Sequence, residues 1–189
     1  MADMRLVFRL VFLLALFLIA FGCGSKMTYQ LENGKSPQNR VQGLPTGGSS
    51  TVKGLTGSFS TTENTVVDLA NETTTPVVLI FSQDTCLTCS EEADELRASL
   101  IAKDKAPSRV RVYTVLVGSN QEDALDWKKA HKVPWTVGYE PRSELLKQYC
   151  AEPKVPCTLV YTKSGGIVFT KIGKASFEEL KALTGPWED

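Results

Sequence analysis

The sequence is poor in net charge, in long apolar runs and in histidine. Its 21 lysines and arginines balance its 21 aspartates and glutamates, and the lack of a basic excess argues against nucleic acid or an anionic membrane surface as a partner. The apolar run at residues 10–21 is shorter than the roughly 20 residues that a transmembrane helix needs. The single histidine, His131, leaves a zinc site few ligands besides cysteine. The cysteines are therefore the residues whose chemistry is considered next.

The start of the chain has the layout of an export signal. Two arginines precede the apolar run, which ends in a short Gly-Cys-Gly-Ser segment around Cys23. A cysteine in this place resembles the end of a bacterial lipobox, although Ala20 and Phe21 depart from that motif. We therefore predict a signal peptide over residues 1–22 and a lipid anchor to the membrane at Cys23, with an uncleaved anchor or ordinary secretion as alternatives.

The next segment, residues 23–57, contains Gly, Ser, Thr and Pro but few apolar residues, so we expect a flexible tether that cannot bury a core. The folded domain is predicted to occupy residues 58–189. With Cys23 lipidated, an even set of cysteines remains, as an oxidising compartment prefers. This favours a protein of the bacterial cell envelope that faces the periplasm or the exterior.

Strands alternate with helices across the predicted domain. Strands are expected at residues 59–61, 65–69, 77–81, 109–117, 134–137, 157–161 and 167–172. Helices are expected after the strand at 77–81, after capping boxes at 119–122 and 176–179, and after Pro141. This order, which ends in an antiparallel hairpin, predicts an α/β fold with a mixed central sheet and helices on both faces.

Cys86 and Cys89 lie where a strand ends and a helix begins. The strand Val77–Phe81 is a continuous apolar run, and apolar residues recur at helical spacing from Leu87 to Ile101. The helix dipole and free amide groups favour a thiolate on the first cysteine. We predict that Cys86 attacks a disulfide and that Cys89 resolves the mixed disulfide. An inert bridge, or half of a zinc site, is the alternative.

This pattern, together with Val155, Pro156 and the apolar strand after Cys157, resembles the thioredoxin superfamily and especially the membrane-anchored TlpA-like thiol-disulfide oxidoreductases. The resemblance covers residues 59–189. It implies a thioredoxin-like fold with an N-terminal β-hairpin and an inserted βα element at residues 122–137. It also implies that Pro156 is cis and faces the cysteine pair, so that Val155 pairs with a substrate strand.

Several residues that adjust the reactivity of the cysteine pair in that family are absent here. The family's Trp before the first cysteine is replaced by Thr85, which we assign to substrate contact, and the acid of its core strand is replaced by Ile80. Glu92 and Leu96 stand where the family has Glu and Leu, but no general base is assigned. Acidic residues crowd the pair from Asp84 onward, and because like charge disfavours a thiolate, we predict a reductant.

Cys150 and Cys157 have three alternative roles: a structural disulfide, an auxiliary redox relay, or two buried free thiols. His131 is expected to be a surface or capping residue. Trp127 and Trp135 are expected to lie in the core or along a groove, with contact to substrate as the alternative.

The resemblance implies an enzyme without a cofactor or bound metal that reduces or isomerises disulfides of exported proteins, with cytochrome maturation among its candidate roles. Its partners would be those proteins and a membrane or periplasmic thiol donor, not nucleic acid. A second hypothesis is a non-catalytic thioredoxin-fold lipoprotein for binding, or for handling copper or zinc. A third is a peroxiredoxin-like peroxidase, which is disfavoured because the Pro-x-x-x-Thr-x-x-Cys signature is absent.

Overall fold

The computed structural model describes residues 54–72, 75–101 and 104–188. The predicted signal peptide, Cys23 and the predicted tether as far as residue 53 lie outside these residues. Across the described ranges, every helix is too short or too polar to cross a membrane.

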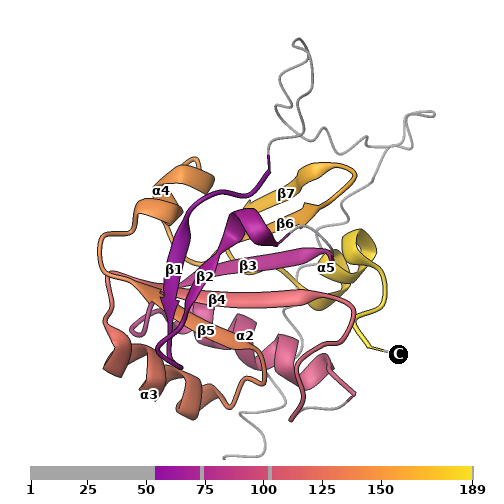
Figure 1. Ribbon diagram of the computed structural model, residues 1–189. Helices are drawn as coiled ribbons and strands as arrows, with labels where there is room; N and C mark the ends of the chain where they lie inside the picture. Colours follow the sequence, from indigo (N-terminus) through magenta and orange to yellow (C-terminus); the bar gives the residue numbers. More distant parts are fainter. Residues whose placement is uncertain (1–53, 73–74, 102–103, 189) are drawn as a thin grey trace, which may run out of the picture. The chain divides into compact units, whose positions relative to one another are not determined.

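A mixed sheet forms the centre of the domain (Figure 1). Within the described residues its strands lie in the order β2-β1-β5-β4-β3-β6-β7. The central strands β3, β4 and β5 run parallel, whereas the outer pairings are antiparallel. The strands are β1 (Ser58–Thr61), β2 (Val66–Asp68), β3 (Val77–Ser82), β4 (Arg111–Val117), β5 (Thr136–Glu140), β6 (Cys157–Thr162) and β7 (Gly166–Ile172). The predicted mixed sheet and both predicted hairpins are confirmed.

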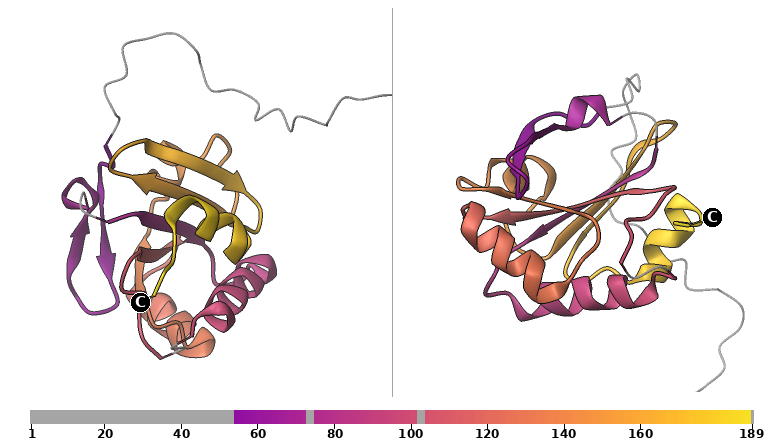
Figure 2. Two further views of the ribbon diagram at one scale, coloured as in Figure 1. Left: turned by 90° about the vertical axis from the view of Figure 1, so that its right-hand side faces the viewer. Right: turned by 60° about the horizontal axis from the view of Figure 1, so that its bottom comes forward.

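Helices cover both faces of the sheet, as predicted (Figures 1 and 2). They are a short 3-10 helix η1 (Leu69–Asn71), α2 (Leu87–Ser99), α3 (Gln121–His131), α4 (Glu144–Tyr149) and α5 (Phe177–Thr184). One apolar core lies between the sheet and α2, α3 and α5, and the other lies between the sheet and η1 and α4. β3 contributes Val78 and Ile80 to the first core and Leu79 and Phe81 to the second. Every residue of β3 is therefore buried, as its continuous apolar run predicts.

The apolar face of α2 differs from the prediction at both ends. Leu87 is 75% exposed, and Ile101 is 86% exposed and lies beyond the helix. The buried face includes Leu96, which the spacing predicts, and also Cys89. Leu87 stands two residues before Cys89, and residues at that spacing do not share a helix face. Leu100 takes an extended conformation as the C-cap, so the helical phase is lost before Ile101.

The capping box of α3 lies one residue later than predicted. Asn120 is the N-cap, and its side chain accepts hydrogen bonds from the backbone N–H groups of Glu122 and Asp123. The Asp123 carboxylate accepts the N–H of Asn120 in return, at 3.1 Å. Ser119, the predicted N-cap, is buried instead. The box that opens α5 is confirmed, since Ser176 and Glu179 cap each other.

Two features extend the packed region beyond the prediction. Leu55, in the predicted tether, is buried in the second core, so the packed chain begins before residue 58. β5 begins and ends later than predicted, and it continues past Val137 because Gly138 pairs with both β4 and β1. A Cβ on Gly138 would lie 2.2 Å from Cδ2 of Phe59, so the ring occupies the space that a side chain would need.

Candidate redox site

Cys86 and Cys89 form a disulfide at the start of α2, with an S–S distance of 2.06 Å and Cα atoms 5.2 Å apart. Cys86 is the N-cap residue, and its Sγ accepts the backbone N–H of Cys89 at 3.2 Å. The preceding turn is held by the Asp84 carboxylate, which accepts the N–H of Thr85 at 2.9 Å. The local structure therefore places the sulfur of Cys86 at the positive end of the helix dipole.

The two sulfurs differ in accessibility. Cys86 is half-buried, whereas Cys89 is only 2% exposed. Thr85 and Leu87, on either side of Cys86, are exposed. An incoming disulfide can thus reach Cys86 but not Cys89, which is the division that an attacking and a resolving thiol require.

The Val155–Pro156 peptide bond is cis. Pro156 directly precedes β6, and the first residue of β6, Cys157, is paired with Phe81 near the end of β3. Since β3 leads into the Cys86 turn, the loop that carries Pro156 and the loop that carries Cys86 leave the same edge of the sheet. Val155 is half-buried, and Pro156 is buried.

A second disulfide joins Cys150 and Cys157, with an S–S distance of 2.05 Å and Cα atoms 6.6 Å apart. Of the three alternatives that the sequence leaves open, two free thiols do not agree with this bridge, and a structural role or a redox relay stays a prediction. Both cysteines are buried in the second core. The bridge closes the loop that carries Val155 and Pro156, and its second cysteine, Cys157, is the first residue of β6.

Glu92 is a fully buried carboxyl one turn after Cys89 on α2. Its Oε1 accepts hydrogen bonds from Thr158 Oγ1 at 2.8 Å and from the N–H of Ala175 at 3.1 Å. Its Oε2 has no hydrogen-bond partner among the described residues. Burial raises the pKa of Glu92 to about 7, although the hydrogen bonds from Thr158 and Ala175 oppose the shift.

The position of Glu92 answers a question that the sequence leaves open. The strand position where thioredoxins carry a buried acid is Ile80 here, and Ile80 is the register partner of Thr158. Because Thr158 donates to Glu92, the buried acid comes to the same region from the helix instead of from the strand. Residues three apart on a helix are neighbours, so Glu92 and Cys89 share one buried face.

His131 links α3 to the first turns of α2, which differs from the predicted surface or capping role. Its Nε2 lies 3.3 Å from Ser90 Oγ, and its Nδ1 lies 3.2 Å from Asp94 Oδ1. Ser90 Oγ in turn donates to the carbonyl oxygen of Cys86 at 3.4 Å. Sequence reasoning could not find this cluster because more than thirty residues separate His131 from its partners.

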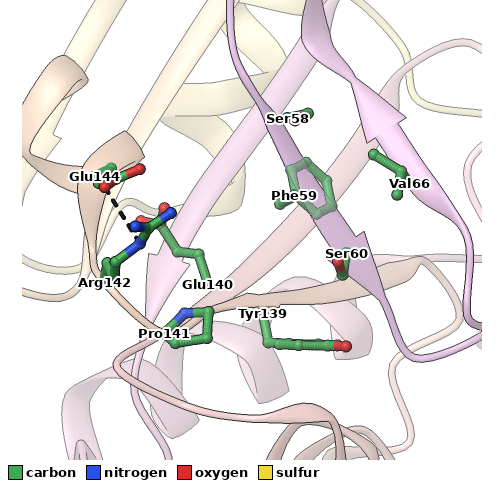
Figure 3. Close-up of a pocket in the computed structure, with 9 residues that line it drawn as sticks. All are labelled: Ser58, Phe59, Ser60, Val66, Tyr139, Glu140, Pro141, Arg142 and Glu144. Carbon is green, nitrogen blue, oxygen red and sulfur yellow. Dashed lines mark ion pairs between the residues drawn. The ribbon is translucent and has the colours of Figure 1, made fainter.

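Two surface cavities differ in their relation to the cysteines. One, of about 390 Å³, begins at Asp84, next to the cysteine turn, and its other lining residues belong to α3: Asp123, Asp126, Trp127, Ala130 and His131. The second, of about 230 Å³, lies between β1, β2 and the segment after β5 (Figure 3). Its lining includes Phe59 and an Arg142–Glu144 ion pair but no cysteine. Neither lining includes a cysteine, but the first cavity includes Asp84, which stands two residues before Cys86. Across the described ranges, no cluster of three or more His, Cys, Asp or Glu side chains could hold a metal ion.

Residues 52–170 match the AhpC/TSA family. The chain belongs to this family. A curated relative from Bacillus subtilis, the sporulation thiol-disulfide oxidoreductase A, is 32% identical over 111 residues, which are 57% of this chain and 65% of the relative. The chain thus spans slightly less than two thirds of that relative's length.

Solved structures of similar fold include StoA from Bacillus subtilis, with a TM-score of 0.56 and 24% identity, covering 70% of this chain and 98% of StoA. A putative protein disulfide isomerase from Bacteroides thetaiotaomicron has a TM-score of 0.60 and 18% identity, with 69% and 82% of the two chains covered. A secreted disulfide oxidoreductase from Mycobacterium tuberculosis has a TM-score of 0.55 and 16% identity, with 68% and 92% covered. The predicted thioredoxin-like fold is confirmed, and so is the resemblance to disulfide oxidoreductases.

Proposed function

We propose that this protein is a thiol-disulfide oxidoreductase that reduces or isomerises disulfides of exported proteins through Cys86 and Cys89. The observation that carries the proposal is the pair itself. A half-buried sulfur caps a helix N-terminus, and its disulfide partner lies buried one turn further on. The curated relative, a thiol-disulfide oxidoreductase by name, supports the same chemistry.

The reaction consists of two exchanges. In the reduced protein the Cys86 thiolate attacks one sulfur of a substrate disulfide, forms a mixed disulfide and releases the other substrate sulfur as a thiolate. The Cys89 thiolate then attacks Cys86, and this releases the second substrate thiolate. Two electrons pass to the substrate, and the protein is left with the Cys86–Cys89 disulfide. A thiol donor restores the reduced pair by the same exchange in reverse.

Glu92 is the group that we assign to the proton of Cys89. The second exchange needs Cys89 as a thiolate, but Cys89 is buried away from water. Glu92 shares its buried helix face, and its raised pKa, about 7, makes it able to accept or return a proton near neutral pH. Its Oε2, which has no partner among the described residues, is free to accept that proton.

Three further elements complete the proposal. The signal-like N-terminus and Cys23 support a lipid-anchored protein of the cell envelope that faces the periplasm or the exterior. The cis Val155–Pro156 bond supports backbone docking of a substrate strand at Val155, with Thr85 as a neighbouring contact. Exported proteins, with apocytochromes among the candidates, are the substrates that this location would supply.

The test is to trap the mixed disulfide. Reduced C89A protein, incubated with a disulfide-containing exported protein, is expected to form a covalent adduct through Cys86 that a reductant releases. C86A is the matched control and is expected to form none, since the buried Cys89 is out of reach. Equal adduct formation by the two variants, or none by either, would refute these roles. Faster oxidation of Cys86 by hydrogen peroxide than by any disulfide would favour the peroxidase hypothesis instead.

A further inference from the structure

We propose that the cavity beside the cysteine pair is a recognition subsite for a basic side chain, preferably arginine, of the substrate segment that flanks the disulfide. The proposal rests on the proposed function and adds the chemical class of the substrate. The cavity, of about 390 Å³, is the one that begins at Asp84 and runs along α3.

The position of the cavity fits a substrate that is engaged at Cys86. Asp84 stands two residues before Cys86, in the turn that holds the cysteine, and its carboxylate accepts the N–H of Thr85. His131, which also lines the cavity, contacts Ser90 in the first turn of α2. Both contacts tie the cavity wall to the redox turn, so a peptide bound at Cys86 passes close to the cavity.

The charge of the cavity favours a cation. Asp84, Asp123 and Asp126 line it, and Asp94 contacts His131 from α2 at 3.2 Å. Part of this charge is offset, because Lys129 pairs with Asp126 at 3.2 Å. Asp84 and Asp123 form no ion pair among the described residues, so the wall keeps a negative excess.

The aromatic wall favours a planar cation that belongs to a peptide. The rings of Trp127 and His131 lie with centroids 4.5 Å apart, and both line the cavity. A guanidinium stacks on an indole and forms paired hydrogen bonds with a carboxylate, which an ammonium does less well. Trp127 is only 5% exposed, and its indole N–H has no acceptor among the described residues. In the proposed subsite, a backbone carbonyl of the substrate segment supplies the acceptor for this N–H, since Trp127 lines the cavity.

The test compares disulfide peptides that differ at one residue beside the disulfide: arginine, its neutral isostere citrulline, or glutamate. The full-length reduced protein is expected to show kcat/KM roughly fivefold to tenfold higher for the arginine peptide than for the citrulline peptide, and lower still for the glutamate peptide. The preference is expected to shrink as salt rises.

The variant D84N/D126N removes two of the three carboxylates that line the cavity, and in it the arginine and citrulline values are expected to converge. The amide oxygen introduced by D84N still offers an acceptor for the N–H of Thr85, so the redox turn is kept. The matched control is E178Q, which removes an exposed charge from α5 and is expected to keep the preference for arginine.

Two further measurements separate the subsite from the chemistry. Reduction of the neutral bis(2-hydroxyethyl) disulfide tests the redox pair alone. If that disulfide is reduced but the three peptides react equally, the subsite is overturned and the oxidoreductase proposal stands. If no disulfide is reduced, calorimetric titration of the oxidised full-length protein with disulfide-free arginine and citrulline peptides still decides the matter. Tighter binding of the arginine peptide, lost in D84N/D126N, would support the subsite, and equal binding would overturn it.

Discussion

At the scale of single residues, the burial of Glu92 lowers stability when the carboxyl ionises, but it also raises the pKa into the range that proton exchange needs. A carboxyl buried without a partner for Oε2 is costly to ionise, and this is why its pKa rises to about 7. A glutamine or methionine at this buried position would avoid the cost of ionisation. The protein keeps an acid there, one turn from the buried Cys89, and this favours a role in proton exchange.

The conflict has a measurable consequence for stability. The folded protein holds the Glu92 proton more tightly than the unfolded chain, whose carboxyl titrates near the ordinary value of 4.5. The contribution of Glu92 to the free energy of unfolding is therefore full below pH 4.5 and falls by roughly 3 kcal/mol as pH rises to 7. In E92Q this fall is expected to disappear. Urea unfolding at pH 5 and pH 8 measures it, with E178Q as the control, and an unchanged pH difference in E92Q would contradict the assignment.

Single residues also show what sequence reasoning can and cannot reach. The sequence reveals Cys86 and Cys89 because their signal is local, a fixed spacing where a strand meets a helix, whereas Pro156 is found through the resemblance to a known family. The contacts of His131 bring together residues far apart in the chain, and no local pattern marks them. Glu92 is noticeable by its position, but its burial against Thr158 depends on how α2 packs on β6.

At the scale of elements, the junction of β1 with β5 depends on one glycine. The ring of Phe59 lies over Gly138, and a Cβ there would be 2.2 Å from Cδ2 of the ring. G138A is expected to lower the free energy of unfolding by about 1 to 3 kcal/mol, because either the ring or the strand must move. G54A is the matched control, since a Cβ at Gly54 meets nothing within 4 Å. Equal stability of the two variants in urea would show that β1 is packed differently.

The loop between α4 and β6 is the second element with a specific prediction. The Cys150–Cys157 bridge closes a loop with a sequence separation of 7, and by the chain-entropy relation this closure contributes about 2.5 kcal/mol. C150A/C157A is expected to lose at least that much stability in urea. Because the loop carries Val155 and Pro156, we also expect a larger loss of kcat/KM for a protein disulfide than for bis(2-hydroxyethyl) disulfide. An equal loss for both substrates would show that the bridge does not help to dock substrate.

Element boundaries are the least predictable part of the fold. The sequence predicts that the helix after the cysteine pair includes Leu100 and Ile101, because their apolar character continues the helical spacing. The structure ends α2 at Ser99, and Leu100 remains buried from an extended conformation. Burial alone therefore does not define the helix end. By contrast, both strands of the Cys157–Ile172 hairpin are predicted almost residue for residue, because turn glycines mark them.

At the scale of the whole molecule, the order of strands and helices is enough to predict a mixed sheet covered on both faces. Local sequence patterns do not predict the strand order, because β1 pairs with β5, which lies far from it in the sequence. That order places the cysteine turn, the cis-proline loop and the start of α3 at the edge of the sheet where β3 and β4 end. The candidate redox site is a product of this topology.

The reduction potential of the Cys86–Cys89 pair in the full-length protein tests the proposed chemistry most directly. Titration in glutathione buffers, with alkylation and mass detection that resolves this pair from Cys150 and Cys157, is expected to show one reversible two-electron transition. Asp84 and Glu91 lie close to Cys86 in the sequence, and because their negative charge disfavours its thiolate, we expect a potential below about −220 mV, in the range of reductants. A pair that stays unreactive over the whole accessible range would contradict the oxidoreductase proposal and leave a non-catalytic scaffold in its place.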